Sequence, residues 1–365
     1  MQITELSILG YERVVEALDP ASGLHAFIAV HDTTLGPALG GLRAWKYTDR
    51  EAALWDVLRL AKGMTYKSAV ASTGLGGGKS VIMLPANGKT PELFRAMGRV
   101  IESMGGLYIT AEDVGTSIAD LEQVRLETRH VTGLSRDGGS SGNPSPYTSR
   151  GVFLGLKATL KARTGSDALA GRHIAIQGAG AVARHLIDFL VAEGAKITVC
   201  DVAKSALDLV RAVHPQVNIV SPESIFDVEA DLLAPCALGG ILDDNTIPRL
   251  RVKAIAGAAN NQLKEPRHGA ALVARGILYA PDYVINAGGI INVSCELLPE
   301  GYNESRSLTK IDRIPEALTE IFTIAERQGI SPAVAADHLA ESILRAKTCP
   351  AVPVGLTSAP EKGSQ

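Results

Sequence analysis

The ten residues Ile174–Ala183 read IAIQGAGAVA, and this stretch decides the predicted fold of the second half of the chain. An apolar run is followed by the pattern G-x-G-x-x-A, formed by Gly178, Gly180 and Ala183. This combination is typical of a strand that turns sharply into a helix. Gly178 allows the tight turn, Gly180 lets the backbone approach a pyrophosphate, and the small Ala183 permits close helix–strand packing. Asp201 ends the next expected strand, where its carboxylate would accept hydrogen bonds from ribose hydroxyls and repel a 2′-phosphate. The stretch therefore predicts binding of NAD rather than NADP, and the alternative is a plain β–turn–α joint that binds nothing.

Around this stretch, short apolar strands alternate regularly with helices. Such alternation predicts an α/β fold with a doubly wound parallel sheet. The last stretch, Ile311–Lys347, is expected to form two amphipathic helices separated by the breaker Gly329-Ile330-Ser331-Pro332. The expected elements are helices at Thr148–Ala162 and Ala181–Glu193, and strands at His173–Gln177, Lys196–Cys200, Asp231–Ala234, Ala254–Ala256 and Ile277–Ala280.

The first part of the chain has a mixed pattern that ends at a break rich in Gly, Ser and Pro, Leu134–Pro146. We expect two domains, residues 1–134 and 135–330, with the final helix, 331–350, packing back onto the first domain. The tail from Cys349 is expected to be extended or frayed. The expected elements are strands at Ala26–Val30, Ser80–Leu84 and Leu107–Thr110, and helices at Glu51–Lys62 and Pro91–Met104, capped by Asp49 and Thr90.

The composition is that of a folded globular chain. Its 365 residues are 46% hydrophobic and 21% charged, and 36 Lys and Arg against 39 Asp and Glu leave a formal net charge of −3. This balance provides no general attraction for nucleic acid or anionic lipid, so neither is expected as a partner. The four cysteines are scattered without a metal-binding spacing, which predicts no metal site and fits reduced thiols in a cytoplasm. No signal segment or membrane-spanning run is found, so we expect a cytoplasmic protein.

A second glycine-rich stretch, Gly74–Ser80, resembles a phosphate-binding P-loop but lacks one of its residues. The pattern G-x-x-x-x-G-K-[ST] requires glycine five positions before Gly78, and Thr73 stands there. Glycines accumulate where the backbone passes close to a ligand or adopts a positive φ. We therefore expect Lys79 to project from a tight turn into a cleft.

Lys67, Lys79 and Asp113 lie at expected strand and loop ends and could line one cleft. One ammonium could bind a substrate carboxylate, while the other, its pKa lowered by desolvation and a cationic neighbour, could act near neutral to alkaline pH. Asp113 could then transfer a proton. The alternative is that all three are solvated surface charges.

Eight stretches make the chain resemble the glutamate/leucine/phenylalanine/valine dehydrogenase family, and within it the leucine dehydrogenases most closely. The resemblance extends from about Thr33 to Lys347. The stretches are TTLGPALGGLR (33–43), LRLAKGMTYKSA (58–69), GLGGGKSVI (74–82), ITAEDVGT (109–116), GNPSP (142–146), APCALGGIL (234–242), AGAANNQLKEPRHG (256–269) and YAPDYVINAGGIINV (279–293).

The resemblance implies NAD-dependent oxidative deamination of an L-amino acid to a 2-oxo acid and ammonia, without a metal. It implies that Lys67 binds the substrate carboxylate, that Lys79 polarises the carbonyl or activates the attacking water, and that Asp113 is the general base. It also implies that Asn261 orients the substrate and that Thr148 lies near the nicotinamide amide. In the family the first domain binds substrate and mediates oligomerisation, commonly as dimers or octamers. The active site then lies in the cleft between the domains, with a hinge near Arg136–Pro146.

The resemblance also implies an apolar substrate pocket. Glutamate dehydrogenases carry a lysine at the position of Leu39, and Leu39 cannot pair with a side-chain carboxylate. We therefore expect leucine, valine and isoleucine as substrates, with phenylalanine or tryptophan as the alternative and a non-catalytic NAD-binding sensor or another dinucleotide enzyme as more distant ones. Ile290 stands where leucine dehydrogenases are expected to have valine, which would favour valine as substrate. The expected walls are Leu39, Gly40, Ala111, Ile290 and Val293.

Overall fold

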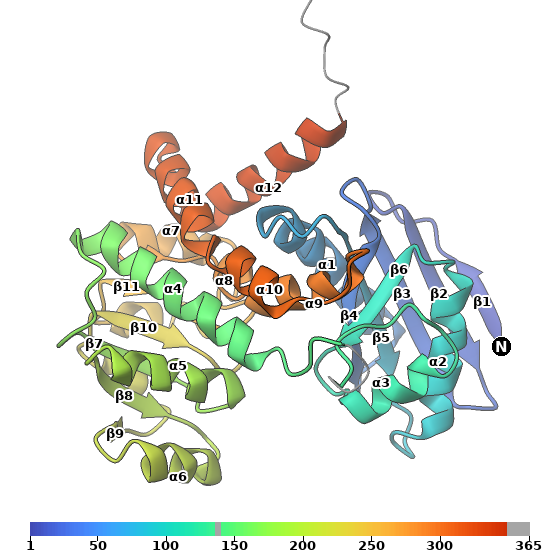
Figure 1. Ribbon diagram of the computed structural model, residues 1–365, viewed down its shortest axis with the longest axis horizontal. Helices are drawn as coiled ribbons and strands as arrows, with labels where there is room; N and C mark the ends of the chain where they lie inside the picture. The colour runs from blue at the N-terminus through green and yellow to red at the C-terminus, as the bar shows by residue number, and fades with distance from the viewer. Residues whose placement is uncertain (136–139, 349–365) are drawn as a thin grey trace, which may run out of the picture.

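The computed structural model describes residues 1–135 and 140–348, arranged as two α/β halves side by side (Figure 1). Part of the expected hinge, 136–139, and the tail from Cys349 lie outside the described residues. Two six-stranded sheets define the halves, one built from β1–β6 and the other from β7–β12. This confirms the predicted two-domain α/β class, while the expected domain limits stay a prediction. Within the described ranges, no helix is both long and apolar enough to cross a membrane.

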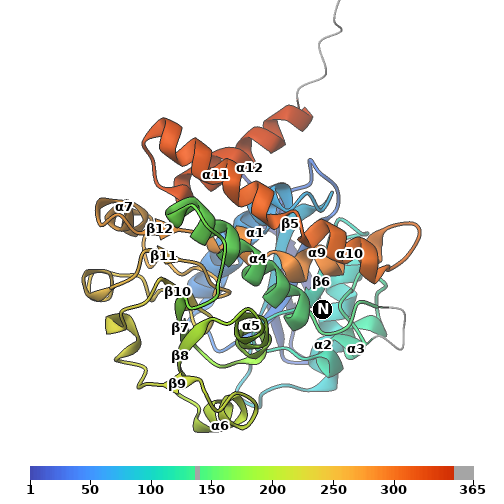
Figure 2. The same ribbon diagram turned by 60° about the vertical axis from the view of Figure 1, so that its left-hand side comes forward.

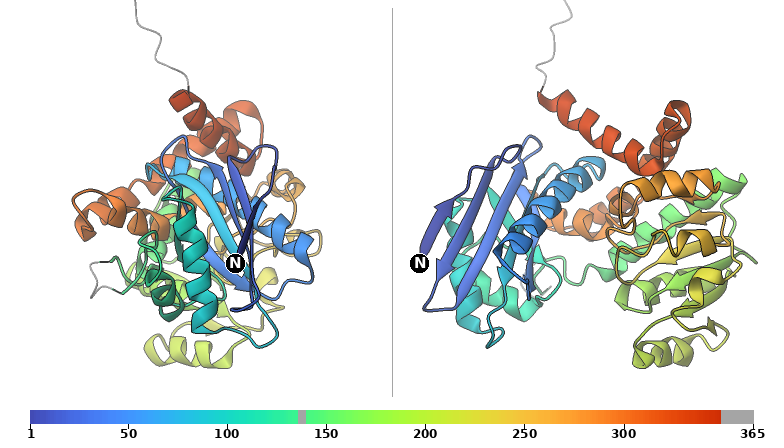
Figure 3. Two further views of the ribbon diagram at one scale, coloured as in Figure 1. Left: turned by 90° about the vertical axis from the view of Figure 1, so that its right-hand side faces the viewer. Right: turned by 180° about the vertical axis from the view of Figure 1, so that it is seen from behind.

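The first sheet has the strand order β1-β2-β3-β5-β4-β6, with β4 parallel to both β5 and β6 and the other pairs antiparallel. Alternate residues of β3 face opposite layers: Phe27 packs with helix α1 and Ile28 with helix α2. Figure 3 shows the sheet edge-on between these helices. The elements are β1 Gln2–Glu5, β2 Arg13–Asp19, β3 Leu24–Asp32, β4 Ala38–Trp45, α1 Arg50–Val70, β5 Gly76–Met83, α2 Pro91–Ser103, β6 Tyr108–Glu112 and α3 Ile118–Arg125.

Both predicted caps of this half are confirmed. Asp49 begins α1 by accepting the backbone N–H of Ala52 at 2.8 Å, and Thr90 begins α2 by accepting that of Leu93 at 3.2 Å. Such caps satisfy amide donors that the first helical turn leaves without partners. The predicted helix at Glu51–Lys62 continues two turns further, so that Lys67 lies on α1.

The second sheet is wholly parallel, in the order β12-β11-β10-β7-β8-β9. Figure 2 shows the strands in this sequence, with α5 beside β7 and β8. The order changes direction next to β7, which is where ligands bind in doubly wound sheets. The elements are α4 Ser145–Thr164, β7 His173–Gln177, α5 Ala181–Ala192, β8 Lys196–Cys200, α6 Lys204–Val213, β9 Asn218–Ile219, β10 Leu232–Pro235, β11 Ala254–Ile255, α7 Arg267–Ala274 and β12 Leu278–Tyr279.

The last helices run from the second sheet back towards the first half (Figures 1 and 3). The last of them, α12, packs against both α11 and α1, and Tyr66 of α1 donates a hydrogen bond to Glu341 of α12 at 3.0 Å. The two predicted C-terminal helices are thus confirmed. The elements are α8 Asp282–Ile285, α9 Gly288–Ser294, α10 Glu304–Ile311, α11 Ile314–Gln328 and α12 Pro332–Thr348.

Candidate active site

A cavity of about 420 Å³ lies between the two halves. Its walls come from β4, α1, β5 and β6 on one side and from α4, the segment 258–261, α8 and α9 on the other. The structure therefore brings together residues that are far apart in the sequence. The sequence-predicted residues that line it are Leu39, Gly40, Lys67, Lys79, Ala111, Asp113, Thr148, Asn261, Ile290 and Val293.

Lys79 and Asp113 form a buried ion pair in this cavity. The Lys79 ammonium lies 2.9 Å from Oδ2 of Asp113, and Lys79 is only 4% exposed. Arg43 donates from Nε to the same oxygen at 3.0 Å. Burial raises the pKa of Asp113, but the positive charges of Lys79 and Arg43 outweigh it and hold this pKa below its usual value. Asp113 is therefore ionised at neutral pH and able to accept a proton.

The expected tight turn before Lys79 is wrong, because Gly76–Lys79 belong to strand β5. Only Gly74 of this stretch has a positive φ, +77°. The glycines instead allow close packing: a Cβ on Gly77 would lie 2.0 Å from the backbone nitrogen of Thr65 on α1. The strand can approach α1 so closely because it lacks side chains there, and this places Lys79 and Lys67 at one cavity.

Lys67 reaches across the cavity from α1 to the second half. Its ammonium donates to Oδ1 of Asn286 at 2.6 Å, and Asn286 donates in turn to the backbone oxygen of Ala258 at 3.0 Å and to Asn260 at 2.7 Å. Burial lowers the pKa of Lys67 to about 8, opposed by Asp282 and reinforced by Lys79. The Lys67 residue as a whole is only half-buried, but its ammonium is enclosed, and it is the burial of the ammonium that lowers this pKa.

Several residues of this cavity were missed by the sequence reasoning. Asn286 and Asn260 orient Lys67, Arg43 binds Asp113, and Asp282 is a buried carboxylate near Lys67. Asp282 accepts the backbone N–H groups of Gln262 at 2.8 Å and Tyr283 at 2.6 Å, while burial raises its pKa. The signal that could have found these residues is their position inside the quoted stretches 33–43, 256–269 and 279–293.

The apolar part of the cavity includes Leu39, Ile290 and Val293, all of them nearly buried. Gly40 has a structural reason for being glycine, since a Cβ there would lie 1.7 Å from the backbone oxygen of Gly78 on the neighbouring strand. Its place at the wall therefore follows from the packing of β4 on β5. No group of metal-binding side chains was found among residues 1–135 and 140–348.

The glycine loop after β7 adjoins the cavity, because Val182 of α5 also lines it. Gly178 has φ +103°, and a Cβ there would lie 2.8 Å from Ala237. A Cβ on Gly180 would meet open space, and Gly180 begins α5 without a side-chain cap. Such an open helix N-terminus fits an anion such as a pyrophosphate. Ala183 is fully buried, as close packing of helix on strand requires.

Asp201 lies at the end of β8 and bonds to the same loop. Its Oδ2 accepts the backbone N–H of Ala179 at 2.6 Å, and its Oδ1 accepts that of Ala203 at 2.7 Å. The carboxylate therefore fixes the glycine loop as well as placing a negative charge at the end of the strand. Gly178, Gly180 and Ala183 thus lie on the loop and helix that Asp201 holds in place, and Thr148 on α4 lines the lysine cavity itself.

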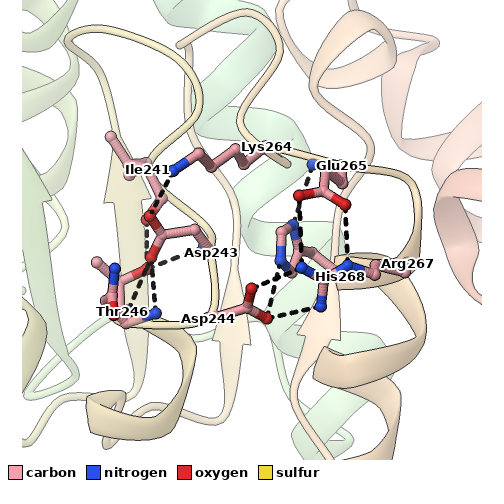
Figure 4. Close-up of polar contacts among 9 residues, drawn as sticks. Ile241, Asp243, Asp244, Thr246, Lys264, Glu265, Arg267 and His268 are labelled. Atoms are coloured by element: carbon pink, nitrogen blue, oxygen red, sulfur yellow. Dashed lines mark hydrogen bonds and ion pairs between the residues drawn. The ribbon is translucent and has the colours of Figure 1, made fainter.

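A group of charged residues joins the loop 241–246 to the segment 264–268 (Figure 4). Arg267 bonds both oxygens of Asp244, at 2.7 and 2.5 Å, and Lys264 bonds Asp243 at 3.3 Å. A backbone hydrogen bond also joins the two segments near the cavity, where the N–H of Gly240 donates to the backbone oxygen of Asn261 at 2.7 Å. Asn261, which has φ +51°, is held in this way at the cavity rim.

Comparisons with known proteins match both halves of the chain to one family. The model described as Glu/Leu/Phe/Val dehydrogenase, dimerisation domain, matches residues 11–130, and the Glutamate/Leucine/Phenylalanine/Valine dehydrogenase model matches residues 198–341. Leucine dehydrogenase of Geobacillus stearothermophilus is 54% identical over 91% of this chain and 90% of its own. Phenylalanine dehydrogenase of Bacillus thermotolerans is 45% identical over 92% of this chain and 89% of its own.

A solved structure extends the likeness to three dimensions. L-tryptophan dehydrogenase from Nostoc punctiforme has a TM-score of 0.81 and 41% identity, covering 93% of this chain and 97% of its own. The resemblance inferred from the quoted stretches is confirmed. The chain therefore belongs to the glutamate/leucine/phenylalanine/valine dehydrogenase family.

Proposed function

We propose that this chain is an amino acid dehydrogenase that oxidatively deaminates branched-chain L-amino acids to 2-oxo acids and ammonia, and catalyses the reverse reductive amination. The observation that supports this most directly is the 54% identity to leucine dehydrogenase over 91% of the chain. The apolar wall of Leu39, Ile290 and Val293 fits an aliphatic side chain. A glutamate side chain would leave its charge without a partner there, which is costly.

The reaction removes a hydride and a proton from the amino acid and adds water. NAD, when bound, accepts the hydride from the substrate Cα. The resulting imine takes up water at the same carbon, and loss of ammonia then yields the 2-oxo acid. The charged residues of the cavity must therefore bind a carboxylate, polarise the reacting carbon and move protons.

Three side chains fit these tasks. The ammonium of Lys67 binds the substrate carboxylate, and Lys79 stabilises negative charge on the oxygen that forms when water adds. Asp113 accepts the proton from the substrate amine and from the attacking water. The ion pair of Lys79 with Asp113, at 2.9 Å, supports this division, because the positive charge of Lys79 helps to keep the carboxylate of Asp113 ionised and ready to accept a proton. Asn261 orients the substrate from the opposite rim.

The cofactor that we propose is NAD. The open helix N-terminus at Gly180 suits the pyrophosphate, and the charge of Asp201 opposes a 2′-phosphate. Ala183 permits the close approach of α5 to β7, and Thr148 of α4, which lines the cavity, would hold the nicotinamide end of the cofactor. NAD is thus expected to support turnover better than NADP.

We further propose that residues 1–134, completed by 331–350, bind substrate and form a homo-oligomer, either a dimer or an octamer, while 135–330 bind NAD. The description of the family model over residues 11–130 as a dimerisation domain supports this. Light scattering of the purified chain tests the proposal, and a monomer would contradict it.

The experiment that tests the function follows the absorbance of NADH. Purified protein is mixed at alkaline pH with NAD or NADP and with L-Leu, L-Val, L-Ile, L-Phe, L-Trp or L-Glu. Faster turnover of the aliphatic substrates supports the proposal, whereas faster turnover of aromatic ones keeps the chemistry and overturns the substrate class. NAD binding without any turnover would support a non-catalytic sensor instead.

A further inference from the structure

Asp113 receives two cations on a single oxygen. Lys79 on β5 and Arg43 on β4 both bond to Oδ2, at 2.9 and 3.0 Å. In the part of the chain that the structure describes, neither cation bonds to Oδ1. Because both cations bond to Oδ2, we expect the other oxygen, Oδ1, to be the one that accepts a proton from the substrate.

Arg43 is itself held from its other side. Its NH1 donates to Oδ2 of Asp56, on α1, at 2.9 Å. Asp56 is 7% exposed and also binds the hydroxyl of Tyr47 at 2.8 Å and NH2 of Arg59 at 2.6 Å. Unlike Arg43, Asp56 is not among the residues that line the cavity. A line of alternating charges thus runs from Lys79 through Asp113 and Arg43 to Asp56.

The guanidinium group makes this arrangement directional. Its donors lie in one rigid plane, so that the bond from NH1 to Asp56 fixes where Nε points. Nε in turn fixes Oδ2 of Asp113. A lysine at position 43 would provide one flexible ammonium and could not hold both carboxylates in this geometry.

We propose that Arg43 is a positioning residue for the general base Asp113, and that Asp56 orients Arg43 for this purpose. The proposal rests on the proposed function, in which Asp113 accepts the proton. Neither residue needs to contact the substrate for this role. Arg43 orients the carboxylate, and Asp56 offsets the positive charge that Arg43 brings to the cavity.

The charges of Arg43 and Asp56 should each affect the pH dependence of kcat in a way that a purely structural role would not. The charged and titratable groups around Asp113 are Lys79, Arg43, Lys67, Glu112, Asp56 and the phenols of Tyr47 and Tyr108. Removing the positive charge of Arg43 raises the pKa of Asp113, so the acid limb of kcat moves to higher pH. Removing the negative charge of Asp56 lowers that pKa, so the acid limb moves to lower pH.

The test compares Arg43→Gln, Arg43→Lys and Asp56→Asn in the full-length protein with NAD and L-leucine. Arg43→Gln is expected to lower kcat by about 10- to 100-fold, the usual effect of losing one charge-assisted hydrogen bond, with a smaller change in KM. Arg43→Lys restores the acid limb to its wild-type pH but not the full kcat. Asp56→Asn moves the acid limb in the opposite direction to Arg43→Gln.

Arg50→Gln is the matched control. Arg50 also pairs with a half-buried carboxylate, Glu16, through Nε at 2.9 Å and NH2 at 2.6 Å, but it lies at the start of α1 and does not line the cavity. Its removal should leave kcat and the pH profile unchanged. Thermal unfolding of each variant identifies those that fold. If Arg43→Gln does not fold, the comparison of Arg43→Lys with Asp56→Asn decides the proposal.

Two results separate this proposal from the proposed function. If the wild-type enzyme is active and all three variants have the same kcat and the same acid limb as the wild type, the positioning role is overturned and the proposed function is left intact. Shifts of the acid limb in the same direction for Arg43→Gln and Asp56→Asn would also overturn it. An inactive wild type that turns over no amino acid would instead overturn the proposed function.

Discussion

The ammonium of Lys67 on α1 donates a 2.6 Å hydrogen bond to the side-chain oxygen of Asn286, which follows α8 in the other half of the molecule. Asn286 can present this oxygen because its amide nitrogen donates to Ala258 and Asn260. The two halves are therefore joined at the residue that we propose to bind the substrate carboxylate. Changes at Asn286 should alter substrate binding more than the chemical step.

Asn286→Ala removes the acceptor and leaves the Lys67 ammonium without its oriented partner. We propose that Lys67 binds the substrate carboxylate in the ground state and in the transition state alike, so KM for L-leucine is expected to rise about tenfold with a smaller change in kcat. Asn286→Asp should raise KM further, because its carboxylate competes with that of the substrate. Steady-state kinetics check this, with Asn218→Ala on the edge strand β9 as a control. An unchanged KM in both Asn286 variants would remove this residue from substrate binding.

The pKa of Lys67, lowered to about 8 by burial, predicts how binding depends on pH. A lysine whose pKa is lowered in the folded protein loses its proton as pH rises through that value, and a neutral amine binds a carboxylate weakly. KM for a branched-chain 2-oxo acid, whose carboxylate does not titrate in this range, should therefore rise above about pH 8. Lys67→Arg should abolish this rise, because a guanidinium stays protonated. The measurement is reductive amination across pH, and a pH-independent KM in the wild type would contradict the assignment.

The same lowered pKa has a consequence for stability. Below pH 8 Lys67 is protonated in both the folded and the unfolded chain, and folding must bury its charge. Between about pH 8 and 10.5 the unfolded chain binds more protons, so the free energy of unfolding contributed by this group rises with pH. Urea unfolding should show wild type gaining stability relative to Lys67→Met across this window. A constant difference between the two would show that burial of the ammonium is not the cause.

Much of the fold could be predicted from local patterns, but part of the site could not. The strand–turn–helix at Gly178 and the caps at Asp49 and Thr90 depend on neighbouring residues, and the sequence displays them directly. The bond of Lys67 to Asn286 joins positions 219 residues apart, which no local pattern reports. The expected turn before Lys79 was wrong because its glycines were explained by a ligand or by backbone conformation. They are instead required by close packing, and Gly77 makes room for α1.

Gly77→Ala tests this explanation of the glycine run. A Cβ there would lie 2.0 Å from the backbone of Thr65, so α1 would have to move, and the variant should lose about 3 kcal/mol of stability together with activity. Gly74→Ala is the matched control: it has open space but a φ of +77°, so it should lose about 1–2 kcal/mol from backbone strain alone. Urea unfolding ranks the two. A milder effect of Gly77→Ala than of Gly74→Ala would mean that the strand and α1 are not in such close contact.

Ile290→Val should change the choice between leucine and valine. Ile290 lines the cavity, and removing one methyl group enlarges the space for the substrate side chain. One methylene in an apolar pocket changes discrimination by about 1–3 kcal/mol, so the ratio of kcat/KM for L-leucine over L-valine should rise about tenfold. Ile291→Val is the control, because Ile291 lies on the same helix but lines a separate cavity of about 190 Å³ beside α11 and α12. An equal rise in both variants would point to a general loosening of α9, whereas a rise in Ile290→Val alone would identify this side chain as a wall of the substrate pocket.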